Sequence, residues 1–316
     1  MEPLVSVGIP TYNRPEGLRH TLNCITSQTY TNLEIIVSDN CSENEEVTKV
    51  INEFAEKDKR IIGIRQKENI GAANNFKYVL GRATGDYFMW AADDDEIESN
   101  NYIEELCMHA KDRVMVFPNV RQFSNGKLNN DKFMRESYIS ASNDLEYLMS
   151  WLNNGSGHPI YGLFNLRMTK LLNFRIDDFC DDLSYFNEGI TLHKLFINGN
   201  IRFVPDVHFR YNSNSNVKKN LRLISDFNRY TLRSIGIYLR SSLPIEVKVK
   251  ALFKIYIQHG KYTYSLVKYH FKGTLSIFKF LMANPRIAFF SFPEFCTNLF
   301  KRIATKNAIT FHSKNN

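Results

Sequence analysis

Two kinds of hydrophobic pattern alternate along the first third of the chain. Short apolar runs are each followed by longer segments in which apolar residues recur every three or four positions. The short runs predict buried strands, and the longer segments predict amphipathic helices. We therefore expect strands at residues 4–9, 33–37, 61–64 and 87–90, and helices at 14–27, 45–57 and 71–80.

Strands that alternate with helices of this length predict βαβ units, and hence an α/β domain with a mostly parallel sheet. In open sheets of this kind, ligands bind beyond the carboxyl ends of the strands. Three polar segments follow the predicted strands directly: Pro10–Arg14, Asp39–Ser42 and Ala91–Asp95. We expect these segments to meet at one edge of the sheet.

The second half of the chain has a weaker pattern. Between Asn119 and Asn154 we expect loops and a helix near 143–152, and Gly155–Pro159 is a chain break. We expect a helix at 181–198 that stops at Gly199, followed by strands at 201–204 and 207–211. Basic, aromatic-rich helices are expected at 221–239, 244–258 and 275–282.

Charge divides the chain into two regions. The net charge is +7, but residues 217–316 carry +15 and the preceding residues carry −8. We therefore predict two parts with different partners, a catalytic domain at 1–215 and a helical region at 216–316.

The five cysteines are scattered without a CxxC spacing, which predicts neither a disulfide framework nor a zinc site and favours a reducing cytosolic setting. No signal peptide or membrane-spanning run is expected.

An acidic cluster, Asp93–Asp95, follows the apolar run 87–90 directly. Adjacent carboxylates repel one another unless a cation or water offsets their charge. Mg²⁺ and Mn²⁺ prefer oxygen ligands and often complete their coordination with substrate phosphates. The cluster therefore favours a metal site that holds a diphosphate. The alternative is a solvated acidic turn that caps the next helix.

Two further acidic positions are candidates. Asp39 can accept the N–H of a nucleobase while Ser42 caps the following helix, and the alternative is a plain helix N-cap. Asp181 and Asp182 open a predicted helix, where a carboxylate can act as general base toward an acceptor hydroxyl. Acids in a first helical turn are also stabilised by the helix dipole alone. The spacing of His193 to other histidines does not indicate a metal cluster, so we expect it to be structural.

These motifs, in this order and spacing, resemble the family 2 glycosyltransferases of the GT-A fold. The resemblance covers about residues 4–215 and rests on Val5–Arg14, Gln28 with Leu33–Asn40, Asn69–Gly71, Gly85–Tyr87 leading into Asp93–Asp95, Asp181–Leu183 and Gly199–Arg202. It implies a GT-A nucleotide-sugar-binding domain. The chain differs from the usual pattern at Asn40, at Cys41, where the family has glycine, and at Asp181, where it has glutamate.

The resemblance also implies roles for individual residues. Asp95 is implied as the ligand of Mg²⁺ or Mn²⁺, and Asp182 as the base, with Asp181 as the alternative. The implied contacts to the nucleotide-sugar are Pro10, Thr11, Tyr12, Asn13, Asp39, Asn69, Gly71, Asp93 and Asp94.

The expected activity is transfer of a hexosyl or deoxyhexosyl group, with inversion, from a nucleoside-diphosphate sugar to a glycan acceptor. A UDP-sugar is the favoured donor, and a lipid-linked acceptor of surface polysaccharide synthesis is the favoured acceptor. The basic region at 216–316 is typical of contact with an anionic inner-membrane surface, or of packing on protein, including another copy of the chain. No motif predicts nucleic-acid binding. The alternatives are a nucleotidyltransferase and a non-catalytic nucleotide- or carbohydrate-binding component of an assembly complex.

Overall fold

The computed structural model describes residues 2–93, 96–124, 127–128, 138–154, 158–171, 187–212 and 221–267. The chain divides into two compact units, Met1–Ile237 and Tyr238–Asn316. The division of the sequence at residue 215 stays a prediction. Within the described ranges, no helix combines the length and the apolar character that crossing a membrane requires.

The first unit is built on one sheet, in which the described residues form nine strands in the order β3-β2-β1-β4-β8-β6-β9-β5, with β7 paired to β6. The long ladders β3-β2-β1-β4 and β6-β9 are parallel, whereas each antiparallel ladder joins only two residue pairs. The mostly parallel sheet is therefore confirmed. The strands are β1 Val5–Thr11, β2 Leu33–Asp39, β3 Ile61–Arg65, β4 Tyr87–Trp90, β5 Glu96–Ile97, β6 Met115–Ser124, β7 Lys127–Leu128, β8 Leu163–Asn165 and β9 Ile201–Asn212.

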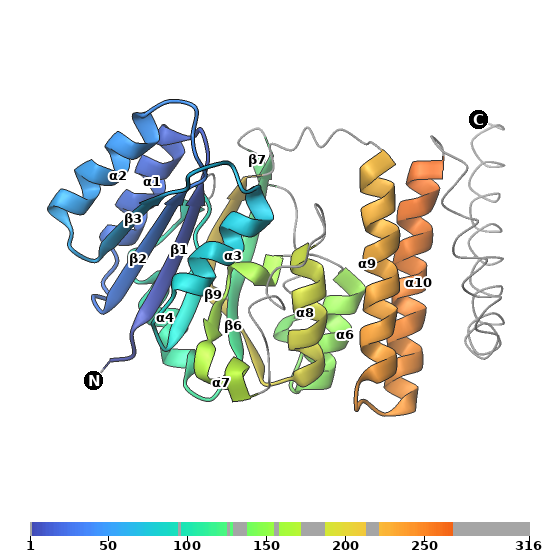
Figure 1. Cartoon of the computed structure of the whole chain (residues 1–316). Helices are drawn as coiled ribbons and strands as arrows, with labels where there is room; N and C mark the ends of the chain where they lie inside the picture. The colour runs from blue at the N-terminus through green and yellow to red at the C-terminus, as the bar shows by residue number, and fades with distance from the viewer. Residues whose placement is uncertain are drawn as a thin grey trace, which may run out of the picture. The chain divides into compact units, whose positions relative to one another are not determined.

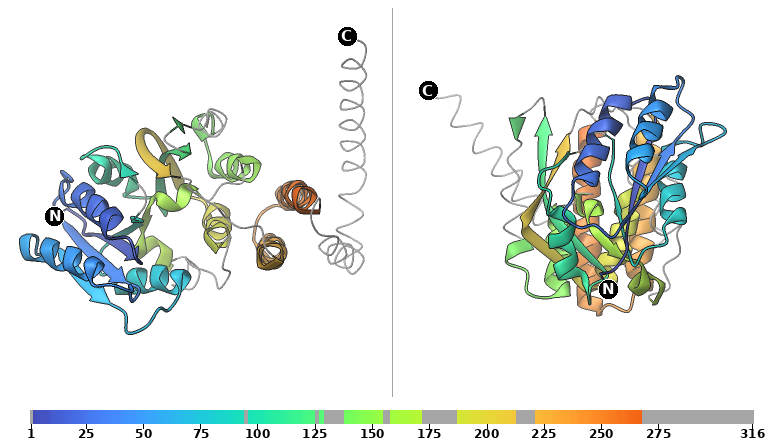
Figure 2. Two further views of the ribbon diagram at one scale, coloured as in Figure 1. Left: turned by 90° about the horizontal axis from the view of Figure 1, so that it is seen from above. Right: turned by 90° about the vertical axis from the view of Figure 1, so that its left-hand side faces the viewer.

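Helices lie on both faces of this sheet (Figure 1), and Figure 2 shows the same layers from two further sides. Val7 and Ile9 of β1 pack with Leu22 of α1 and Val47 of α2 on one face. Gly8 points to the opposite face, toward Val79 of α3. The helices of this unit are α1 Pro15–Thr26, α2 Glu46–Lys57, α3 Ala72–Arg82, α4 Tyr102–Ala110, α6 Asp144–Asn154, α7 Leu166–Leu171 and α8 Asn187–Asn198, with the 3₁₀ helix η1 His158–Tyr161.

All seven elements predicted for the first ninety residues are present, and their ends differ from the prediction by at most two residues. The second half departs from the prediction. Strand β6 occupies part of the segment that we expected to form loops, and it pairs with β9. The two strands expected at 201–204 and 207–211 form one continuous β9. Its register shifts between Val204 and His208, because Pro205, Asp206 and Val207 have no partners in β6 and form a bulge.

The basic region begins with two helices, α9 Leu221–Arg240 and α10 Ile245–Val267, which confirm the helices expected at 221–239 and 244–258. Helix α10 buries residues at every fourth position: Val247, Ala251, Ile255 and His259. The helix expected at 275–282 lies outside the described residues.

Candidate active site

The carboxyl ends of β1, β2 and β3 lie level with one another. Thr11 is the register partner of Asp39, and Asp39 is the partner of Arg65. Strand β4 pairs with β1 through Gly8 and Trp90, and leads into Asp93 at the same edge. The sheet therefore brings the three predicted polar segments together at its carboxyl edge.

Asp93 is buried at this edge and held by two neighbouring side chains. The Thr11 hydroxyl donates a hydrogen bond to Asp93 Oδ2 over 2.7 Å. The Arg14 guanidinium lies 3.2 Å from Asp93 Oδ1. These contacts fix the carboxylate at the junction of β1, α1 and β4. Asp94 and Asp95 lie outside the described residues.

Helix α1 approaches the acidic segment through a glycine. A Cβ atom at Gly17 would lie 2.0 Å from the backbone carbonyl oxygen of Asp93, a distance that real side chains do not reach. Nearby, the Thr21 hydroxyl donates to the carbonyl oxygen of Ala92 over 3.0 Å. Ala92 and Asp93 therefore pack on α1. The segment does not cap a helix, because the next helix, α4, has Asn101 as its N-cap.

Asp39 is fully buried, and both of its carboxylate oxygens accept hydrogen bonds. Oδ1 accepts from the backbone N–H of Ser42 over 2.9 Å and from the Ser42 hydroxyl over 2.5 Å. Oδ2 accepts from Arg65 over 2.8 Å. The expectation that Ser42 or Asp39 caps the next helix is wrong, because α2 begins at Glu46 with Glu45 as its N-cap and no side-chain cap.

Two loop residues at this edge have a left-handed backbone. Asn13 has φ 56° and Cys41 has φ 61°. The Ser42 hydroxyl accepts the N–H of Asn13, and the Asn13 side chain accepts the N–H of Glu43, so the loops after β1 and β2 are joined. The positive φ favours glycine at the position of Cys41, since side chains with a Cβ are strained there.

The loop after β3 is joined to the same cluster through two asparagines. Asn69 Oδ1 accepts the N–H of Gly71 and a side-chain N–H of Asn40, over 2.9 and 3.0 Å. The Asn40 side chain accepts the N–H of Ile70. Gly71 has φ 82° and is the N-cap of α3. Asn69 and Gly71 therefore belong to the same edge, as predicted.

Pro10 is buried within β1, whereas the Tyr12 side chain is exposed. Asp181 and Asp182 lie outside the described residues. Sequence reasoning missed Arg65 as a member of the cluster, and the signal for Arg65 was its place at the end of a predicted strand, level with Asp39.

Sequence reasoning also missed a carboxylate on α8. Glu188 stands in the first turn of this helix, and burial raises the pKa of its carboxyl. A carboxyl with a raised pKa can hold or accept a proton nearer to neutral pH than an exposed one. No group of three His, Cys, Asp or Glu side chains is arranged to hold a metal ion among the residues that the structure describes.

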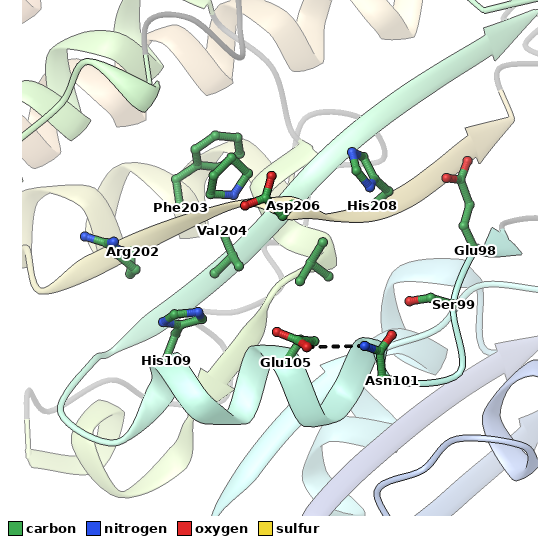
Figure 3. A pocket seen from close by; sticks show the side chains of 12 residues that line it. Glu98, Ser99, Asn101, Glu105, His109, Arg202, Phe203, Val204, Asp206 and His208 are labelled. Atoms are coloured by element: carbon green, nitrogen blue, oxygen red, sulfur yellow. Dashed lines mark hydrogen bonds between the residues drawn. The ribbon is translucent and has the colours of Figure 1, made fainter.

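A separate cavity of about 520 Å³ lies between α4 and the bulged part of β9 (Figure 3). Its charged and imidazole groups are Glu98, Glu105, His109, Arg202, Asp206 and His208. Glu98 pairs with Arg121, and Glu105 accepts from Asn101. No residue predicted to bind the nucleotide-sugar lines this cavity, so it is distinct from the Asp93 site.

Comparison with known proteins identifies the class to which this fold and site belong. The model of "Glycosyl transferase family 2" matches residues 6–180, so the chain belongs to this family. It is similar to the putative teichuronic acid biosynthesis glycosyltransferase TuaG of Bacillus subtilis, with 30% identity over 105 residues that cover 33% of this chain and 41% of TuaG. The chain spans less than half the length of the curated relatives it matches, from 13% to 41%.

Two solved structures share the fold. The complex of S. aureus TarS 1-349 with UDP has a TM-score of 0.63 and 16% identity, and the match covers 81% of this chain and 71% of the TarS 1-349 chain. The mannosyltransferase PcManGT of Pyrobaculum calidifontis, in complex with GDP-Man and Mn²⁺, has a TM-score of 0.53 and 14% identity, covering 92% of this chain and 81% of PcManGT. At these identities the likeness shows the GT-A fold alone.

Proposed function

We propose that this chain is a metal-dependent, inverting glycosyltransferase that moves a sugar from a nucleoside-diphosphate sugar to an acceptor hydroxyl. The observation that carries the proposal is the buried Asp93 carboxylate, held by Thr11 at the carboxyl edge of a family 2 chain. Asp93 lies at the carboxyl edge where the loops after β1 and β2 are joined. That edge is where ligands of open α/β sheets bind.

The donor side of the proposal rests on the clustered loops. Tyr12 offers an exposed ring to a nucleoside, Pro10 lies within the strand that precedes it, and Asn13, Asn69 and Gly71 shape the surrounding loops. UDP in the TarS complex and GDP-Man in the PcManGT complex support a nucleoside-diphosphate sugar as donor. We take a hexosyl or deoxyhexosyl derivative of UDP as the favoured donor.

Mg²⁺ or Mn²⁺ is the proposed cofactor, with Asp95 as its protein ligand and Asp94 beside it. Carboxylate oxygens next to a bound diphosphate fit the ligand preference of these hard cations, and the Mn²⁺ of the PcManGT complex supports this choice. When bound, the ion neutralises charge on the departing nucleoside diphosphate. Asp93, anchored by Thr11 and Arg14, contacts the ribose or the diphosphate.

The proposed base is Asp182, with Asp181 as the alternative. In a single displacement with inversion, the acceptor hydroxyl attacks the anomeric carbon from the face opposite the diphosphate. The carboxylate takes the hydroxyl proton as the new bond forms, while the nucleoside diphosphate leaves from the opposite face.

The proposed acceptor is a glycan of surface polysaccharide assembly, which the likeness to a teichuronic acid biosynthesis glycosyltransferase supports, and we take this glycan to be lipid-linked. The basic region at 216–316 would then bind the anionic inner face of the cell membrane. Its charge of +15 and the exposed cationic residues Arg229, Arg240 and Lys250 on α9 and α10 support this contact. Packing of the same region on another copy of the chain is the competing interpretation.

A panel of nucleotide-sugars, incubated with the full chain and Mn²⁺ or Mg²⁺, tests the activity. We expect release of the nucleoside diphosphate from one donor, and loss of that release in EDTA. Nucleotide binding without turnover of any donor would favour the non-catalytic binding component. Release of pyrophosphate from a nucleoside triphosphate and a sugar phosphate would favour the nucleotidyltransferase.

A further inference from the structure

Arg65 ends β3 and forms an ion pair with Asp39, its register partner at the end of β2. One terminal nitrogen, Nη1, donates to Asp39 Oδ2 over 2.8 Å and to the Thr48 hydroxyl over 3.0 Å. The other, Nη2, donates to the carbonyl oxygen of Ser42 over 2.7 Å. Three neighbours therefore hold the guanidinium in a single orientation.

The two members of this pair differ in their access to solvent. The Asp39 side chain is 0% exposed, whereas the Arg65 side chain is 38% exposed. The carboxylate is already engaged by Ser42 and Arg65. Nothing among the described residues accepts the Nε–H of Arg65. The group that this pair presents to a ligand is therefore the positively charged guanidinium of Arg65, a hydrogen-bond donor. The Asp39 carboxylate, which is an acceptor, is buried beneath it.

The position of Arg65 fits the far end of a bound nucleotide. Resting on the proposed function, the diphosphate lies at Asp93, beyond β4. The Asp93 carboxylate contacts Thr11 at the end of β1, so the order β1-β2-β3 places Arg65 two strand spacings away, roughly 10 Å at about 4.8 Å per spacing. A nucleoside that extends from Asp93 across Thr11 and Asp39 points the outer edge of its base toward Arg65.

We infer that Arg65 is the residue that selects the base of the donor, and that it selects a base with a carbonyl oxygen at its outer edge. Uracil and thymine carry this oxygen at position 4, and guanine carries it at position 6. Cytosine and adenine carry an amino group there, which is itself a donor and leaves the Arg65 N–H without a partner. The ion pair with Asp39 orients Arg65 for this contact.

The test compares two matched pairs of nucleotides, UDP with CDP and GDP with ADP, by calorimetric titration in Mn²⁺. Within each pair the bases differ at the carbonyl or amino position that Arg65 is inferred to contact. We expect the wild-type chain to bind the carbonyl member more tightly by about tenfold or more. Arg65→Ala should bring both ratios close to one. Arg65→Lys keeps the charge beside buried Asp39 and should also lower the ratio, which keeps the test available if Arg65→Ala does not fold.

A matched control is Arg60→Ala. Arg60 also pairs with a neighbouring aspartate, Asp58, but at the opposite end of β3. It should leave both ratios unchanged. If the role of Arg65 were purely structural, its substitution would lower the affinity for all four nucleotides equally. Affinity ratios that stay unchanged in Arg65→Ala and Arg65→Lys would overturn the inference. Equal affinity of the wild-type chain for both members of each pair would also overturn it.

The inference and the proposed function can fail separately. Base selection through Arg65 without turnover of any nucleotide-sugar removes the proposed function and leaves the inference intact. Sugar transfer by a chain that binds UDP and CDP equally removes the inference about Arg65 and leaves the proposed function intact.

Discussion

The Thr11 hydroxyl donates to the Asp93 carboxylate over 2.7 Å and joins the ends of β1 and β4 inside the protein. This contact orients the carboxylate that we place against the donor. Thr11→Val removes the hydroxyl at nearly constant shape. We expect the free energy of unfolding to fall by about 1–2 kcal/mol and UDP affinity in Mn²⁺ to fall several-fold, because Asp93 loses a buried partner.

Thr29→Val is the matched control for this substitution. The Thr29 hydroxyl also donates to a carboxylate, that of Glu104, but on the surface. The expected loss there is below about 0.5 kcal/mol, with no change in UDP affinity. Urea unfolding and calorimetric titration measure both quantities, and equal losses in the two variants would contradict the role assigned to Thr11.

Gly17 is a glycine within α1, where helix propensity alone favours alanine. The structure predicts the opposite, because a Cβ there would meet the carbonyl oxygen of Asp93 at 2.0 Å. We expect Gly17→Ala to lower the free energy of unfolding by about 1–3 kcal/mol. Gly260→Ala, in α10 with nothing within 4 Å of its Cβ, should raise it by about 0.5–1 kcal/mol. A stabilising Gly17→Ala would disprove the close approach.

Cys41 has φ 61°, in the left-handed region. Strain from a non-glycine residue there exceeds the extra chain entropy that glycine loses on folding, so Cys41→Gly should stabilise the protein by about 0.5–1 kcal/mol. Cys24→Gly makes the same change inside α1 and should destabilise it by about 1 kcal/mol. Thermal unfolding of both variants measures the difference, and loss of stability in Cys41→Gly would refute the backbone argument.

His193 is buried between the Trp151 ring and the Tyr230 hydroxyl, so its position agrees with the structural role that the sequence favoured. Burial lowers the pKa of His193 from 6.5 to about 3. The unfolded chain therefore takes up a proton below pH 6.5 that the folded chain does not. Stability from this group is complete above pH 6.5 and falls as the pH drops toward 3, by about 1.4 kcal/mol per pH unit.

Urea unfolding at pH 7 and pH 5 measures this dependence. His193→Phe keeps an aromatic ring beside Trp151 and should reduce the loss of stability between the two pH values. His109→Phe, at an exposed position, should leave the loss unchanged. Burial lowers the pKa of His259 in the same direction, to about 4, so part of the dependence should remain in His193→Phe.

Two carboxylates, those of Asp182 and Glu188, can be compared as candidates for the general base. Asp182→Asn should reduce transfer by at least about 100-fold while nucleotide binding persists, because the acceptor proton then has no base. Glu188→Gln, on α8, tests the carboxyl whose pKa burial raises. Full activity in Asp182→Asn together with loss in Glu188→Gln would move the base to Glu188. Initial rates and calorimetric titration on the same preparations distinguish the outcomes.

The sequence by itself determined the order and the ends of the first seven elements, and the edge at which Asp39 and Asp93 lie. These features are local, because the period of apolar residues defines each strand and helix and parallel strands share one carboxyl edge. The pairing of β6 with β9 joins segments more than eighty residues apart, and only the tertiary structure decided it. The same holds for the approach of Gly17 to Asp93 and for the pairing of Asp39 with Arg65. Each depends on which surfaces meet when the sheet assembles, and no local pattern of residues records that.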